Sequence, residues 1–227
     1  MPRVDLVIAE AAIELIPREL WGEPDVVSFC RRRKKDVRWT LLDSSYHHRA
    51  MRRLSDGHRR GRPDIVHFTL LEALGSPLNL SGMLGVHVHT RDNRWIRVNP
   101  STRLPRVYDR FKGLIEQLYR EGRLTADDGT VLLEMEESDL RSVLEELGPG
   151  QRVLLHESGE DMEAAIGAGS VEADGMKLIV GGFPHGDFGP EVLEVVDVGL
   201  RVSNHRLDAW VAVSRALCLL ERHLLGS

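Results

Sequence analysis

Three arginines and one aspartate occur together in the segment Arg59-Arg60-Gly61-Arg62-Pro63-Asp64. Pro63 suits the first turn of a helix, which places Asp64 where the helix dipole favours a negative charge. An Asp64 carboxylate paired with Arg62 can hold that guanidinium in the pose that a phosphate or a base requires. The segment therefore predicts an arginine that a carboxylate positions to bind a phosphate or a base.

A second basic segment, TRLPRVYDRF, carries Arg103, Arg106 and Arg110. Their spacing puts them on one side of a helical entry, although Pro105 bends the approach. Guanidinium groups in such a row suit the phosphates of a nucleic acid. The aromatic residues of the segment, Tyr108 and Phe111, can stack on bases, but packing in the core is the favoured interpretation.

Two loops in the last third of the chain suit a cofactor. Residues 181–189, GGFPHGDFG, follow an apolar strand, and ligands of open α/β sheets lie at the carboxyl ends of strands. This loop matches neither a Walker loop nor a GxGxxG fingerprint, and a tight structural turn explains it equally well. Residues 202–207, VSNHRL, precede the terminal helix, and Ser203 or Asn204 is equally explained as the cap of that helix.

The net charge of -5 hides a division along the chain. Residues 1–123 hold 23 Lys and Arg against 15 Asp and Glu, whereas residues 124–227 hold 7 against 20. Residues 31–62 alone carry 12 basic and 3 acidic side chains, most of the basic ones arginine. A solvated helix face is the alternative, but arginine among Gly, His and Tyr favours phosphate binding by the first part.

Other features narrow the class of protein. Hydrophobic residues make up 42% and charged residues 29%, as in a globular protein. No uncharged apolar run approaches the roughly 20 residues of a membrane helix, and acidic residues interrupt the apolar start of the chain, which argues against a signal peptide.

The cysteines and histidines indicate neither a disulfide scaffold nor a metal site. Cys30 and Cys218 are too few for a disulfide scaffold, which fits the cytoplasm, and Cys218 is expected in the core. His87 and His89 share a strand face without a third ligand, so no metal site is predicted.

The elements that must position these residues alternate along the chain. Strands are expected at residues 5–9, 41–42, 131–135, 152–156, 177–180 and 195–202, and a hairpin at residues 84–89 and 94–98. Helices are expected at residues 11–20, 25–35, 46–54, 63–74, 106–124, 139–147 and 207–225, with residues 43–45 capping the third. This alternation predicts an α/β fold.

Four stretches together carry a resemblance: LLDSSYHHRAM, RRGRPDIVHFTLLEALGSPLN, HTRDNRWIRVNPSTRLPRVYDRF and VGGFPHGDFG. In this order, and over nearly the whole chain, they resemble the ribosome-biogenesis family of pseudouridine-N1-specific rRNA methyltransferases, of the SPOUT class and archaeal type. The resemblance implies one α/β domain over residues 1–227, with a basic RNA-facing part at about 1–123, an inserted β-hairpin, and a C-terminal trefoil knot at about 150–227.

The resemblance also implies the ligands and the site residues. S-adenosylmethionine would be bound by the knot loops, and the RNA, a small-subunit rRNA loop containing pseudouridine, by arginines. The matching cofactor positions are His156, Gly181, Gly186, Val202, Ser203, Asn204, His205, Arg206 and Leu207. The matching RNA positions are Arg62, Arg103, Arg106 and Arg110, with Asp64 orienting Arg62; no general base is identified. Members are homodimers, and ribosome-assembly proteins are further candidate partners.

Two alternatives remain open at this stage. A non-catalytic assembly factor would use the same basic surface to bind rRNA while its cofactor pocket served no reaction. An enzyme with the same fold would methylate another rRNA or tRNA nucleotide.

Overall fold

The computed structural model of the protein describes residues 4–226. Residues 1–3, the first of the apolar start that argued against a signal peptide, and residue 227 lie outside the described residues.

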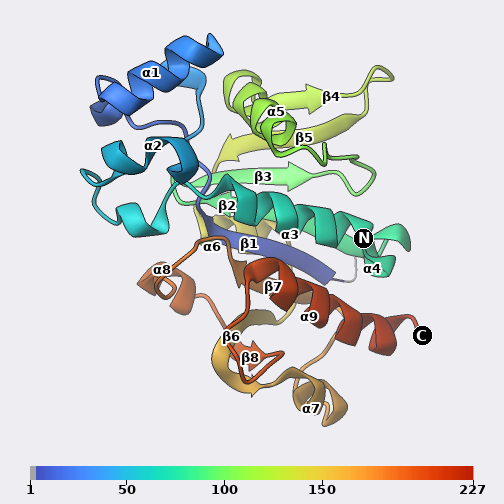
Figure 1. Cartoon of the computed structure of the whole chain (residues 1–227). Helices are drawn as coiled ribbons and strands as arrows, with labels where there is room; N and C mark the ends of the chain where they lie inside the picture. The colour runs from blue at the N-terminus through green and yellow to red at the C-terminus, as the bar shows by residue number, and fades with distance from the viewer. Residues whose placement is uncertain (1–3, 227) are drawn as a thin grey trace.

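An eight-stranded mixed sheet forms the centre of the structure, in the order β4-β5-β3-β2-β1-β7-β6-β8 (Figure 1). Strands β2, β1, β7, β6 and β8 run parallel, whereas β3, β5 and β4 join the β2 edge in antiparallel pairs. The strands are β1 (Val4–Ala11), β2 (Leu84–Thr90), β3 (Arg94–Val98), β4 (Arg123–Thr125), β5 (Val131–Glu137), β6 (Arg152–Asp161), β7 (Met176–Gly181) and β8 (Val198–Arg201). The predicted α/β class is confirmed.

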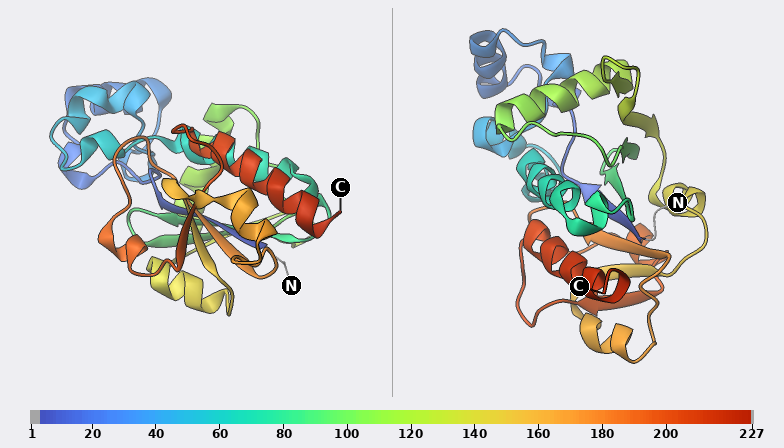
Figure 2. Two further views of the ribbon diagram at one scale, coloured as in Figure 1. Left: turned by 90° about the horizontal axis from the view of Figure 1, so that it is seen from below. Right: turned by 90° about the vertical axis from the view of Figure 1, so that its right-hand side faces the viewer.

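Helices cover both faces of the sheet, because the apolar side chains of the central strands alternate between two cores. Leu6 and Ile8 of β1 belong to the main core, which includes α3, α5, α7 and α9, whereas Val7 and Ala9 face α6 and α8 on the other side (Figure 2). The helices are α3 (Pro63–Gly75), α4 (Pro77–Leu80), α5 (Tyr108–Glu121), α6 (Leu140–Glu146), α7 (Met162–Gly167), α8 (Pro190–Leu193) and α9 (Ala209–Leu224).

A smaller lobe with its own core carries ten of the twelve basic residues of segment 31–62. This basic lobe consists of α1 (Pro24–Arg33), η2 (Val37–Trp39), α2 (Ser44–Met51) and η3 (Gly57–Arg59). Its apolar cluster includes Leu20, Phe29 and Met51 and is separate from the cores of the sheet. Asp43 accepts a hydrogen bond from the Ser45 backbone, so the predicted capping of this helix by residues 43–45 is confirmed.

The lobe contains a histidine whose titration should be visible in its stability. His47 is fully buried, and its Nδ1 accepts a hydrogen bond of 3.0 Å from the Asp43 backbone. Within residues 4–226 its Nε2 has no hydrogen-bond partner. Burial lowers the pKa of His47 to about 4.

We predict that acid weakens the protein partly through His47. Unfolding restores an ordinary pKa of about 6.5, so the unfolded chain takes up a proton that the folded chain refuses until about pH 4. The contribution of neutral His47 to the free energy of unfolding is therefore complete above about pH 6.5. It falls as the pH is lowered, by about 2 kcal/mol between about pH 7 and pH 5. His47→Asn keeps an acceptor for Asp43 but does not titrate. Urea unfolding at both pH values should show a smaller acid loss in this variant, and an equal loss would contradict the prediction.

One predicted helix is wrong. Residues 11–20 form no α-helix: β1 continues to Ala11, an isolated bridge joins Leu15 to Leu41, and η1 (Arg18–Leu20) ends the segment. The backbone here bonds to other parts of the chain instead of to itself, because Pro17 removes a donor and nearly every apolar side chain is buried. A buried apolar run does not distinguish a helix from an extended segment.

Several boundaries also differ from the predictions. Residues 41–42 contribute only the bridge at Leu41, and residues 195–202 form a strand only over β8. The helix expected at residues 106–124 begins at Tyr108, and Leu124 lies in β4. The predicted hairpin strands pair antiparallel, but β2 also pairs in parallel with β1.

Candidate functional site

A pocket of about 270 Å³ lies at the carboxyl ends of the parallel strands β7 and β8 and at the middle of β6 between them, where the register of β6 against β8 shifts between Leu155 and Glu160. The first turns of α3 and α9 close its sides. Its lining includes these residues of the cofactor prediction: His156, Gly181, Gly186, Val202, Ser203, His205, Arg206 and Leu207. The sheet therefore brings together three loops that are separated by up to about fifty residues in the sequence, at the edge where α/β sheets bind ligands.

The loop after β7 forms one wall. The Gly182 backbone N–H donates to Ala9, and the Gly182 carbonyl accepts from Ala12, so the start of the loop is fixed to the segment after β1. Gly186 has a φ of +91°, which a residue with a side chain would reach only with strain. The rings of Phe183 and Phe188 meet edge to face, with centroids 5.2 Å apart, and both line the pocket.

The loop after β8 forms the opposite wall, with one departure from the prediction. Ser203 Oγ accepts a hydrogen bond from the His205 backbone, so it stabilises its own turn, and the helix is preceded by Asp208 instead. The capping of α9 by Ser203 or Asn204 is therefore wrong. Asn204 does not line the pocket; its Oδ1 accepts a hydrogen bond of 3.1 Å from Arg201.

The third loop of the pocket interrupts β6: residues 156–159 lie between Leu155 and Glu160, which both pair with Leu200 of β8. Polar contacts connect this loop with the other two. His156 Nε2 lies 3.1 Å from Asp187 in the β7 loop. Glu157 pairs with Arg206 in the β8 loop, and this hydrogen bond lowers the pKa of Glu157. With Asp208, these carboxylates give the pocket an acidic rim, as the charge division of the sequence indicated for this part.

Arg62 and Asp64 form the predicted pair at the entry of α3. Arg62 Nε donates to Asp64 Oδ1 at 2.8 Å, and Arg62 Nη2 donates to Oδ2 at 2.7 Å. This hydrogen bond raises the pKa of Arg62. Arg62 lines the pocket together with Ile65 of the same helix, so the basic part of the sequence reaches the candidate cofactor site at this residue.

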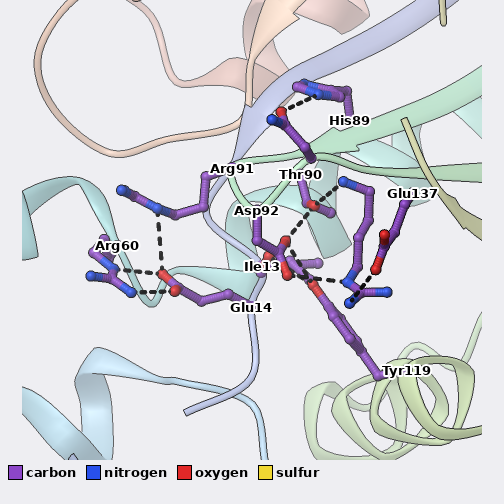
Figure 3. Close-up of polar contacts among 11 residues, drawn as sticks. Ile13, Glu14, Arg60, His89, Thr90, Arg91, Asp92, Tyr119 and Glu137 are labelled. Atoms are coloured by element: carbon purple, nitrogen blue, oxygen red, sulfur yellow. Dashed lines mark hydrogen bonds and ion pairs between the residues drawn. The ribbon is translucent and has the colours of Figure 1, made fainter. Parts of the chain in front are cut away.

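The two arginines before Arg62 are also engaged by carboxylates. Arg59 Nη2 lies 2.8 Å from Glu10, and Arg60 pairs with Glu14, towards which Arg91 also points (Figure 3). The three guanidinium groups of this junction thus meet three different carboxylates. Within the described part of the chain, only Arg62 of the three lines the pocket.

Arg103, Arg106 and Arg110 lie outside the pocket, on the approach to α5. All three are exposed, and none has an ion-pair partner among residues 4–226. His67 Nε2 lies 2.7 Å from the Pro105 carbonyl and holds the loop that precedes the helix. Phe111 is fully buried and Tyr108 is half-buried with its hydroxyl on Asp43, so the core interpretation of both rings is confirmed.

The sequence left part of the lining unidentified. Glu157, Asp187, Asp208 and Trp210 face the pocket because they neighbour predicted positions in the three loops. Their positions next to predicted loop residues were the only signal in the sequence for a place in the pocket. That the loops meet depends on the order of the strands in the sheet, which this signal does not contain. Cys218, expected in the core, is exposed on α9.

A metal-binding cluster and a membrane-spanning helix are both absent from the described residues. Residues 4–226 contain no group of three or more His, Cys, Asp or Glu side chains placed for a metal; His87 contacts Asp5 and Trp95, and His89 contacts Asn93. Within the same range, no helix is long and apolar enough to cross a membrane.

The lining of the pocket has the chemistry of a small-molecule ligand site. Apolar side chains such as Leu155 and Leu200 lie beside backbone groups of three loops, and carboxylates lie at the rim. Apolar walls with a few placed polar groups are typical of cofactor sites. Fold and pocket together define an α/β protein with a ligand site at the carboxyl ends of parallel strands and a basic surface beside it.

Comparisons with known proteins give the family. A model of the EMG1/NEP1 methyltransferase family matches residues 6–221. The chain is 43% identical to the ribosomal RNA small subunit methyltransferase Nep1 of Thermococcus kodakarensis, over 96% of this chain and 98% of that protein, and 46% identical to Nep1 of Pyrobaculum neutrophilum, over 95% and 96%. The structure of Archaeoglobus fulgidus Nep1 bound to S-adenosylhomocysteine matches with a TM-score of 0.85, at 39% identity, over 96% of this chain and 97% of that one. The chain belongs to the EMG1/NEP1 methyltransferase family.

Proposed function

We propose that the protein transfers a methyl group from S-adenosylmethionine to N1 of a pseudouridine in small-subunit rRNA. The observation that carries the proposal is the position of Arg62, which belongs to the basic part of the chain and lines the pocket at the strand ends. Relatives named rRNA methyltransferases and a solved relative bound to S-adenosylhomocysteine support both the reaction and the cofactor.

The pocket residues would hold the cofactor through the three loops. His156, Gly181, Gly186, Val202, Ser203, His205, Arg206 and Leu207 line it directly, and Asn204 would act through Arg201. Bound S-adenosylmethionine would supply a methyl group bonded to a sulfonium. N1 would form the new bond to the methyl carbon as the carbon–sulfur bond breaks, S-adenosylhomocysteine would be the leaving group, and the N1 proton would be released to solvent. Both Asp64 oxygens accept hydrogen bonds from Arg62, so Asp64 orients Arg62 and is not assigned as the base for that proton.

The specificity for pseudouridine follows from its ring. Pseudouridine has an N–H at ring position 1 where uridine has the nitrogen bonded to ribose, so only the isomer offers that nucleophile. Aligning it with the methyl group provides much of the acceleration that a displacement requires. Arg62, which pairs with Asp64 and lines the pocket, would orient the base or its phosphate.

The exposed row Arg103, Arg106 and Arg110 would bind the phosphates of the rRNA loop. Arg106→Ala should weaken RNA binding, and the slope of log K against log salt concentration should become shallower by about 0.7, because one phosphate contact is lost. Affinity for S-adenosylhomocysteine should not change. Arg141→Ala, on α6 at the other face of the sheet, is the control, and an unchanged slope for Arg106→Ala removes Arg106 from the phosphate contacts.

We also propose the finer features of the fold and assembly. The first is the trefoil knot that the family resemblance implies for the C-terminal part, in which β6 pairs with both β7 and β8. The antiparallel β2–β3 pair supports the inserted hairpin. Phe68 and Val211 are exposed on α3 and α9, and Phe68 contacts Trp210, which supports a homodimer through these helices. Sedimentation equilibrium of the purified chain tests the dimer.

One experiment tests the function against its alternatives. The protein is mixed with methyl-labelled S-adenosylmethionine and either of two RNA hairpins that differ only by uridine or pseudouridine at the target. Transfer only to the pseudouridine hairpin supports the proposal. RNA binding without transfer favours an assembly factor, and transfer to both hairpins excludes N1 of pseudouridine as the acceptor.

A further inference from the structure

Two residues outside the pocket, Glu10 and Arg59, contact the loop after β7. Glu10 and Arg59 do not line the pocket, yet each contacts the loop of residues 181–189. Glu10 lies in β1, where the register against β2 shifts between Ile8 and Ala11, and Arg59 belongs to η3 in the basic lobe. Neither residue has a role in the function proposed above.

Glu10 fixes the far end of the loop. Its Oε1 accepts a hydrogen bond of 3.0 Å from the Gly189 backbone, and its Oε2 accepts one of 2.8 Å from Arg59. A Cβ at Gly189 would lie 2.6 Å from Glu10 Oε1, so a residue with a side chain here would displace the Glu10 carboxylate from its present position. Glu10 itself has a φ of +49°, an unfavourable conformation that persists only where surrounding contacts hold it.

Arg59 holds the middle of the same loop. Its guanidinium lies over the Phe183 ring at 4.3 Å from the centroid, and a Cβ added at Gly186 would lie 3.5 Å from Arg59 Cδ. Phe183 packs edge to face on Phe188, so the position of Arg59 is transmitted to both rings that line the pocket. A cation over an aromatic face is favourable, and the carboxylate of Glu10 keeps this cation in place.

We propose that the Glu10–Arg59 pair is a positioning pair that preorganises the cofactor loop, so that the basic lobe contributes to cofactor affinity without touching the cofactor. This inference rests on the proposed function, because it takes the pocket to bind S-adenosylmethionine. A loop that is ordered before binding does not have to be ordered by the ligand, and this raises affinity.

The same basic loop offers a matched control. Arg60 and Glu14 form a second ion pair, more buried than the first, with side chains that are 12% and 7% exposed. Glu14 contacts Arg60 and Arg91 at the turn between β2 and β3 and no residue of the cofactor loop (Figure 3). Loss of this pair should therefore destabilise the fold at least as much as loss of the Glu10 pair but leave the pocket wall unchanged.

Calorimetric titration with S-adenosylhomocysteine and thermal unfolding test the proposal on the wild type, Glu10→Gln, Arg59→Lys and Glu14→Gln. We expect Glu10→Gln to weaken binding about tenfold, because the loop must then be ordered by the ligand. Arg59→Lys should fall between it and the wild type, since lysine keeps the charge but loses the flat group over Phe183. Glu14→Gln should lower the melting temperature with affinity within about twofold of the wild type.

The outcomes separate this inference from the function on which it rests. A wild type that does not bind S-adenosylhomocysteine contradicts the proposed cofactor. A wild type that binds, with Glu10→Gln binding equally well, overturns the positioning role. Equal losses in Glu10→Gln and Glu14→Gln overturn it as well, because the effect would then be a general loosening of the basic loop.

Discussion

Asp64→Asn should lower kcat/KM for methyl transfer to a pseudouridine hairpin by about a hundredfold while affinity for S-adenosylhomocysteine stays within about twofold. The Asp64 carboxylate accepts two hydrogen bonds from Arg62, at 2.8 and 2.7 Å, and asparagine offers only one acceptor atom. Arg62 would then leave the orientation that the pair imposes. Charge-assisted bonds of this kind contribute about 2 to 3 kcal/mol, which corresponds to the expected loss.

The chain contains a control with the same spacing. Asp36 and Arg38 form another pair two residues apart, with both oxygens of Asp36 accepting from Arg38, but on an exposed turn of the basic lobe. Asp36→Asn should leave methyl transfer unchanged, since neither residue approaches the pocket. If Asp64→Asn instead weakens S-adenosylhomocysteine binding as much as it slows transfer, Arg62 serves the cofactor and not the RNA.

Local signals in the sequence were enough for most elements of the fold. Pro63 and Gly75 mark the ends of α3, Asp43 caps α2, and alternation over residues 84–98 gave the β2 and β3 strands. The helix expected at residues 11–20 failed because this segment bonds to strands, loops and side chains far away in the sequence. Its Ala12 backbone bonds to Gly182 on one side and Arg62 on the other, and no local pattern contains that information.

In the candidate site, too, local contacts were predictable from the sequence and distant ones were not. The Arg62–Asp64 pair is local, two residues apart, so its formation could be read from residue types and the helix start. The ion pairs of Arg59 with Glu10 and of Arg60 with Glu14 could not be predicted from local patterns, since the two members of each pair lie more than forty residues apart in the sequence. Composition made these arginines look available for phosphates, whereas the fold uses them to fix the segment after β1.

The second large effect should appear in stability, at a buried ion pair that joins the basic lobe to α5. Asp43 and Lys112 are nearly inaccessible to solvent, and Lys112 Nζ donates to Asp43 Oδ2 at 2.8 Å. Burial by itself raises the pKa of Asp43, but the hydrogen bond and charge of Lys112 outweigh it and lower the pKa below its ordinary value. Tyr108 donates to the same oxygen at 2.9 Å, and burial with the nearby Asp43 charge raises the pKa of Tyr108.

Lys112→Met should therefore lower the free energy of unfolding by about 3 to 5 kcal/mol, because it leaves the Asp43 carboxylate buried without its cation. Adding Asp43→Asn to Lys112→Met should recover part of that loss, since the buried charge is then gone. Arg53→Met is the exposed comparison, for its pair with Glu23 lies at the surface and contributes little. Urea unfolding of the wild type, Lys112→Met, Asp43→Asn and the double variant gives the coupling energy by a double-mutant cycle, and Arg53→Met is measured beside them. The prediction fails if the double variant loses as much stability as the sum of the two single losses. Packing around Lys112, and not its charge, would then hold α5 to the lobe.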